Sequence, residues 1–96
     1  KYIKVRNNTT TVTSNQFQVY PNPFTKVVNI FYANTLASTN TISILDIAGR
    51  TVYTKDLGKE EPGLHEISLT PIIPNGVYLI KLNIGNVTQY SKVIKQ

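Results

Sequence analysis

The side chains best suited to acid–base or metal chemistry are one histidine and a few carboxylates. His65 is the only histidine, and the acids are Asp46, Asp56, Glu60, Glu61 and Glu66. A catalytic base needs a nucleophile or an orienting partner, and a metal site needs several ligands. The acids also lack the D-x-D-x-D-G spacing of a calcium loop. We expect no catalytic residues and no cofactor, and a structural role for His65. A calcium site made from loop carbonyls and one or two acids stays open as a weaker interpretation.

The absence of cysteine narrows the chemistry further. It removes thiolate zinc sites, iron–sulfur clusters and thiol nucleophiles. The five glycines are scattered among turns and form no phosphate-binding loop. These observations favour a protein that is not an enzyme.

The charge pattern bears on possible partners. The formal net charge is +5, but the ten cations are dispersed and form no block of five or more. This favours a solvated, mildly basic surface over a nucleic-acid partner. No apolar run approaches the roughly 18 residues that a membrane-spanning helix needs, so we expect no membrane span.

Aromatic residues could form a sugar-binding platform if they were exposed. The chain has nine aromatic residues and no tryptophan, and most lie at strand positions suited to a core. We expect Tyr53 and Tyr90 to be the most exposed of them. Core packing is therefore the favoured interpretation of the aromatic residues.

The chain divides into two parts by composition. Asn7 to Asn15 is polar, with Val12 as its only large side chain. We interpret residues 1–16 as a linker or as the end of a preceding domain. Residues 17–96 are interpreted as one folded domain.

Short β-prone segments separated by turn residues fill this domain. Strands are predicted at 17–20, 27–32, 41–47, 50–55, 64–69, 77–84 and 87–95, and loops at 33–40, 57–63 and 71–76. Apolar residues alternate within several strands, as at Val28, Ile30 and Tyr32, and no segment has a helical period. Segment 77–84 is apolar on both faces, which indicates a central strand. The pattern predicts an all-β, immunoglobulin-like antiparallel sandwich of about seven strands.

Three local features are expected to shape this fold. Pro21 and Pro23 each fix φ and lack an N–H, so their segment should be extended and lie at a sheet edge. Asp46 and Gly49 suit the first and fourth positions of a tight hairpin turn. Tyr78 follows Gly76 at a strand start, where a tyrosine hydroxyl commonly binds an earlier loop in immunoglobulin-like domains.

An ordered series of motifs spans most of the chain. It comprises Y-P-N-P-F at 20–24, I-L-D-I-A-G-R at 44–50, G-L-H-E-I-S-L at 63–69, G-V-Y-L-I-K-L at 76–82 and S-K-V-I-K at 91–95. In order and spacing these motifs resemble the C-terminal sorting domain of the type IX secretion system, also called the Por secretion tail. The resemblance covers residues 17–96.

The resemblance implies a function without catalysis. The domain would direct an N-terminal cargo protein from the periplasm across the outer membrane to the cell surface or medium. Its partners would be the outer-membrane translocon and a sortase-like peptidase that removes it. Recognition would be carried by Gly76, Tyr78, Lys92, Val93, Ile94 and Lys95. A strand at a sheet edge also offers unpaired backbone groups for strand addition.

An alternative function is an accessory binding module of a secreted enzyme. Such fibronectin-like sandwiches bind carbohydrate or protein, and an exposed aromatic platform or a calcium site would favour this alternative. For the sorting function we expect removal of residues 93–96 to leave the domain largely folded while blocking export.

Overall fold

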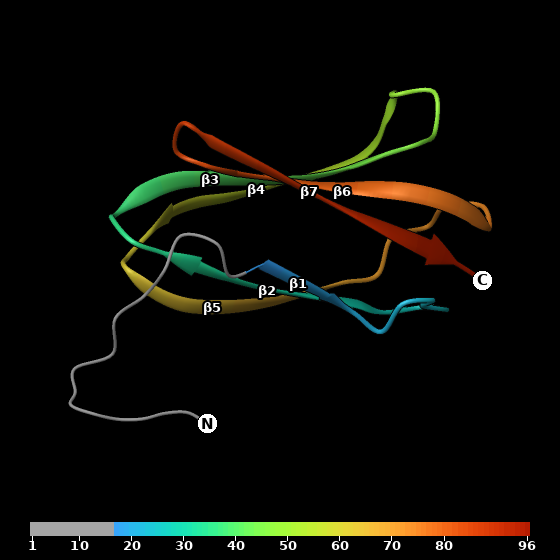
Figure 1. Ribbon diagram of the computed structural model, residues 1–96, viewed down its shortest axis with the longest axis horizontal. Helices are drawn as coiled ribbons and strands as arrows, with labels where there is room; N and C mark the ends of the chain where they lie inside the picture. Colours follow the sequence, from blue (N-terminus) through green and yellow to red (C-terminus); the bar gives the residue numbers. More distant parts are fainter. Residues whose placement is uncertain (1–16) are drawn as a thin grey trace.

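Two antiparallel sheets face each other in the described part of the chain. The computed structural model describes residues 17–96, so the expected linker at 1–16 lies outside the described residues. The strands are β1 (Phe17–Tyr20), β2 (Val28–Asn34), β3 (Ser38–Leu45), β4 (Thr51–Glu60), β5 (Gly63–Leu69), β6 (Gly76–Ile84) and β7 (Val87–Lys95). One sheet has the order β1-β2-β5 and the other has β4-β3-β6-β7 (Figure 1). The predicted all-β, immunoglobulin-like sandwich is confirmed.

Side chains that alternate along the strands form the core between the sheets. Val28, Ile30 and Tyr32 of β2 are fully buried. They face Ile42 and Ile44 of β3, which are also fully buried and belong to the same core cluster. Because successive strand residues point to opposite faces, this two-residue period places one apolar face of each sheet inward. Each such side chain contributes about 1.5–3 kcal/mol when it leaves water.

The central position predicted for segment 77–84 is confirmed. β6 pairs with β3 on one side and with β7 on the other. Its inward residues Ile80 and Leu82 are fully buried, while Val77 and Leu79 on the other face are partly exposed. The apolar residues on both faces of segment 77–84 therefore correctly indicated a strand with a neighbour on each side. Within the described part of the chain, no other element covers the outer face of β6.

The prediction of a charged loop at 57–63 is wrong. β4 continues to Glu60, where it pairs with Ser38 of β3. A bulge accommodates Gly58, whose positive φ of 71° suits glycine and whose N–H donates to Asp56 Oδ1 at 2.9 Å. The exposed face of an edge strand tolerates charged residues, so composition alone suggested a loop.

The connection between β2 and β3 is also shorter than predicted. Only residues 35–37 separate the two strands, and Ala33, Asn34 and Asn40 are buried. Polar residues at the strand ends suggested a longer loop. Their burial reflects a polar cluster described below.

The segment after β1 bends instead of extending as predicted. Residues 21–23 form bends, and the peptide bonds before Pro21 and Pro23 are cis. The segment lies beside an edge strand, as expected, but that strand is β7 of the other sheet. Phe24 forms a parallel bridge with Lys95 there.

Of the two tyrosines predicted to be exposed, Tyr90 is exposed and Tyr53 is not. Tyr90 is 56% exposed, as predicted. Tyr53 was expected to be exposed but is partly buried and packs against the core cluster. Its partner Ile44 in β3 faces inward, and residues directly opposite in a sheet share a face.

Different features gather at the two ends of the sandwich. The β1–β2 connection, the β3–β4 hairpin and the end of β7 lie at one end (Figure 1, right). The β2–β3 and β4–β5 connections and the β6–β7 hairpin lie at the other (Figure 1, left). The first end carries the recognition residues implied by the resemblance, and the second carries the polar cluster.

Candidate functional site

The terminal strand β7 carries four of the expected recognition residues. It is an edge strand of its sheet, because only β6 pairs along its length. Lys92 and Ile94 point to the outer face and are exposed, whereas Val93 points inward and is fully buried. Of the consecutive residues 92–95, therefore, only some present their side chains to a partner.

The β1–β2 connection crosses to the free edge of β7. The Phe24 N–H donates to the Ile94 carbonyl at 2.9 Å, and the Gln96 N–H donates to the Phe24 carbonyl at 2.8 Å. The Asn22 side-chain amide donates to the Lys92 carbonyl at 3.3 Å and accepts from the Ile94 N–H at 2.9 Å. We call residues 21–24 the strap, because they attach the first sheet to the end of the second.

The strap changes what the end of β7 can offer. We expected the terminal strand to present unpaired backbone groups, but the strap occupies both groups of Ile94 and the carbonyl of Lys92. An amide side chain and a short parallel bridge thus stand where a neighbouring strand would lie. The expectation of a free edge is wrong from the Lys92 carbonyl to Gln96.

The same contacts bear on truncation. Removing residues 93–96 deletes the buried Val93 and both backbone partners of Phe24. Loss of a buried aliphatic side chain and of paired backbone groups destabilises a small domain. The expectation that such a truncation leaves the fold intact is therefore not supported by these contacts.

Gly76 and Tyr78 lie beside the same end of β7. In the register of β6 and β7, Gly76 is opposite Lys95 and Tyr78 is opposite Val93. Tyr78 is buried, and its hydroxyl donates to the Pro74 carbonyl at 2.6 Å, which confirms the predicted bond to an earlier loop. The structure thus brings the six expected recognition residues together, with Tyr78 and Val93 facing the core.

The turn at Asp46 and Gly49 has the predicted geometry. The Gly49 N–H donates to the Asp46 carbonyl at 2.9 Å, and Gly49 has a positive φ of 87°. Asp46 Oδ1 accepts from the N–H groups of Arg50 and Ala48, each at 2.9 Å. The Arg50 N–H, the Arg50 side chain and the Ala48 N–H all stabilise the carboxylate and lower the pKa of Asp46. Asp46 thus holds the turn closed.

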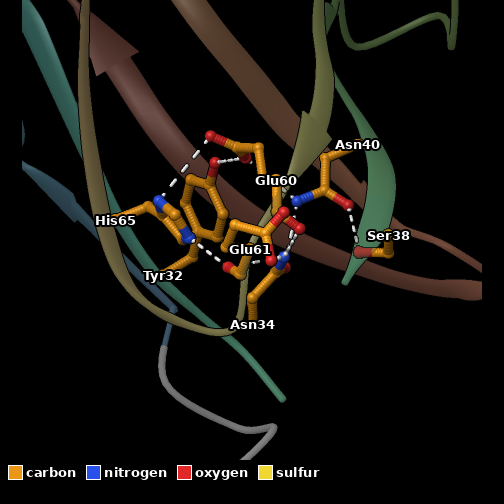
Figure 2. Close-up of polar contacts among 7 residues, drawn as sticks. All are labelled: Tyr32, Asn34, Ser38, Asn40, Glu60, Glu61 and His65. Carbon is orange, nitrogen blue, oxygen red and sulfur yellow. Dashed lines mark hydrogen bonds and ion pairs between the residues drawn. The ribbon is translucent and has the colours of Figure 1, made fainter. Parts of the chain in front are cut away.

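A buried polar cluster at the opposite end was not predicted (Figure 2). Glu60 lies at its centre, with a side chain that is 17% exposed. Glu60 Oε1 accepts from the Tyr32 hydroxyl and from Asn40 Nδ2, the latter at 3.0 Å. Asn40 Nδ2 also lies 3.0 Å from Asn34 Oδ1, and Asn34 Nδ2 donates to the Glu60 carbonyl at 3.1 Å. The cluster joins β2, β3 and β4 across the two sheets.

His65 completes this cluster from β5. Its ring stacks on Tyr32 with centroids 5.4 Å apart, and its Nε2 donates to the Glu61 carbonyl at 2.7 Å. Its Nδ1 lies 3.7 Å from Glu60 Oε2. The ring is thus stacked on Tyr32 and hydrogen-bonded at Nε2 within the cluster.

Burial of the phenol gives this cluster an expected pH signature. Burial, followed by the hydrogen bond to Glu60 and its negative charge, raises the pKa of Tyr32 well above its usual range. An unfolded tyrosine ionises at about pH 10, while the folded one keeps its proton to higher pH. The contribution of Tyr32 to the free energy of unfolding is therefore complete below about pH 10, and it is lost progressively as the pH rises from there through the raised pKa of the folded state.

We expect Tyr32→Phe to remove this contribution. Urea unfolding of both proteins at pH 8 to 11 would measure it. The wild type should lose more free energy of unfolding above about pH 10 than the variant does. Equal losses in both proteins would contradict the assignment to Tyr32.

The described residues offer neither a metal-binding cluster nor a membrane-spanning helix. Within residues 17–96, no three His, Asp or Glu side chains gather in a way that could hold a metal ion. Over the same residues, no helix has the length and apolar character to cross a membrane.

Comparison with known protein families identifies a family model that matches most of the chain. The model of the family described as the secretion system C-terminal sorting domain matches residues 18–96. The match covers every strand, since only the first residue of β1 precedes it. No curated protein matches the chain.

Proposed function

Since the chain belongs to the family of secretion system C-terminal sorting domains, we propose that it carries an attached N-terminal cargo across the outer membrane by type IX secretion. The family match over residues 18–96 supports a type IX sorting signal and is the observation that carries this proposal. The cargo would pass through the periplasm and reach the cell surface or the medium.

Recognition would use the outer face of β7. Lys92 and Ile94 are exposed there, and Lys95 lies beside them with its Nζ 3.3 Å from Asn75 Oδ1. Tyr78 and Val93 are buried and would position this strand instead of touching a partner. A folded signal must present a surface, and an edge strand presents both side chains and backbone groups.

Removal of the domain by a sortase-like peptidase forms a further part of the proposal. A peptidase takes an extended segment into its active site, whereas the strands from β1 onward are hydrogen-bonded in sheets. Cleavage N-terminal to Phe17 would leave the sandwich intact. Mass spectrometry of the exported cargo should therefore find its new C-terminus upstream of residue 17, and a terminus inside residues 17–96 would contradict this.

Export of a reporter tests the function directly. A reporter with a periplasmic signal and residues 1–96 at its C-terminus would be expressed in a bacterium that has the type IX machinery. We expect the reporter at the surface or in the medium, and we expect it to stay in the periplasm without residues 1–96 or in a strain that lacks the translocon.

Periplasmic retention of a folded, intact fusion would contradict the proposal. That result would favour the accessory binding module, which carries out its function without an export apparatus. Resistance of the retained domain to protease would show that it had folded, so misfolding could be distinguished from failed recognition.

A further inference from the structure

We propose that the first half of β7, from Thr88 to Lys92, is a strand-addition site for an extended acidic segment of the export machinery. The inference rests on the proposed function and adds to it the site and the chemistry of a partner. It follows from the way in which the strap divides the edge of β7.

The orientation of the backbone groups along β7 is set by two contacts. Ile94 directs both its N–H and its carbonyl outward to the strap. In an antiparallel pair, alternate residues direct their groups toward or away from the partner strand. Thr88, Tyr90 and Lys92 therefore also direct theirs outward, away from β6.

Among residues 17–96, hydrogen-bonding partners outside β6 occupy only the C-terminal half of this edge. The strap takes both groups of Ile94 and the carbonyl of Lys92. Within the described residues, both groups of Thr88 and Tyr90 and the N–H of Lys92 have no such partner. A strand laid there could form up to about five backbone hydrogen bonds.

The strap itself shows that this edge accepts an added backbone. The bonds between Phe24 and residues 94 and 96 are those of a parallel strand. Phe24 is only 1% exposed, so displacing the strap would expose a buried aromatic side chain to water. A partner would therefore take the open half instead of displacing the strap, and the strap would set where the added strand ends.

Positive charge on the outer face of β6 and β7 favours a partner strand with acidic side chains. Lys92 and Tyr90 flank the open edge on the outer face, and Lys81 of β6 lies directly opposite Tyr90. The outward residues of β6 and β7 include no acid; they are Val77, Leu79, Lys81, Asn83, Thr88, Tyr90, Lys92 and Ile94. A strand with carboxylates on this face would find complementary charge, and Tyr90 would offer it apolar contact.

Proline substitution tests the open edge and keeps the backbone bonds between β6 and β7. Thr88→Pro removes an outward N–H and blocks an added strand, and proline is tolerated where an edge N–H faces solvent. Thr54→Pro is the matched control at the other edge of the same sheet. The Thr88 hydroxyl would lose its bond to Asn83 Oδ1. The Thr54 hydroxyl of the control would lose its contact with Ser43 Oγ. Thr54 is opposite Ser43, whose backbone groups turn toward β6 by the same alternation, so the Thr54 N–H also points outward.

Both variants would be compared in the reporter assay, with folding verified by thermal unfolding. We expect Thr88→Pro to lower export at least tenfold, while Thr54→Pro exports like the wild type. Equal export of all three would overturn the inference and leave the sorting function intact. If the wild type is not exported, both the proposed sorting function and the proposed strand-addition site are contradicted.

A charge reversal gives a second test in case proline prevents folding. Lys92→Glu should lower export severalfold, while the control Lys59→Glu on β4 should not. Unchanged export of Lys92→Glu would overturn the proposal that the partner is acidic.

Sedimentation of the 96-residue chain should show a monomer. A dimer that Thr88→Pro dissociates would overturn the inference, because the occupant would then be a second copy.

Discussion

Replacement of Phe24 by alanine is expected to lower the free energy of unfolding by about 3–5 kcal/mol. The Phe24 ring is only 1% exposed and belongs to the core cluster. It also anchors the strap, whose backbone bonds attach the end of β7 to the other sheet. Loss of the ring removes apolar contacts, leaves a cavity and loosens these bonds. The effect is large for a small domain, whose total stability is about 5–15 kcal/mol.

Urea unfolding followed by circular dichroism would measure this loss. Phe31→Ala is the matched control, because Phe31 is only partly buried and lies on the outer face of β2. The control should lose about 1 kcal/mol, as partly exposed side chains do. Similar losses in the two variants would mean that Phe24 does not anchor the strap.

Much of the fold could be predicted because it depends on local pattern. The two-residue period of Val28, Ile30 and Tyr32 identified a strand and its buried face, and all three are fully buried. The turn at Asp46 and Gly49 could also be predicted, since its bonds join residues at most four positions apart. Such short-range features are encoded by the residue types themselves.

The strap could not be predicted, because it depends on contacts between distant residues. Asn22 binds Lys92 and Ile94, which lie 70 and 72 positions further along the chain. In the sequence, Pro21 and Pro23 predicted an extended segment at a sheet edge, but neither its bend nor the strand that it would cover. The open and occupied halves of β7 follow only from that contact.

The polar cluster was missed for a related reason. Lys59, Glu60 and Glu61 are charged neighbours, and such residues usually mark a solvated loop. Glu60 is instead largely buried, since donors from Tyr32 and Asn40 compensate its carboxylate. Two asparagines flanking a short turn after a buried tyrosine were the available signal, because buried amides need partners.

Glu60→Ala is expected to lower the free energy of unfolding by about 3 kcal/mol or more. The change removes Glu60 Oε1, which accepts from the buried Tyr32 hydroxyl. It also removes one of the two acceptors of Asn40 Nδ2. An unsatisfied buried group costs about 1–3 kcal/mol, and bonds to a charged acceptor are at the upper end. Urea unfolding at pH 7 would measure the loss.

Two further variants separate the role of Glu60 from that of any exposed acid. Glu60→Gln keeps an acceptor oxygen at nearly the same place, so it should cost only about 1 kcal/mol. Glu66→Ala, an exposed acid on β5, should change stability by less than about 0.5 kcal/mol. A Glu60→Ala loss as small as that of Glu66→Ala would show that water replaces the carboxylate. A large loss in Glu60→Ala and a small one in Glu60→Gln would show that the cluster needs an acceptor at this position more than a charge, which is what a structural cluster requires.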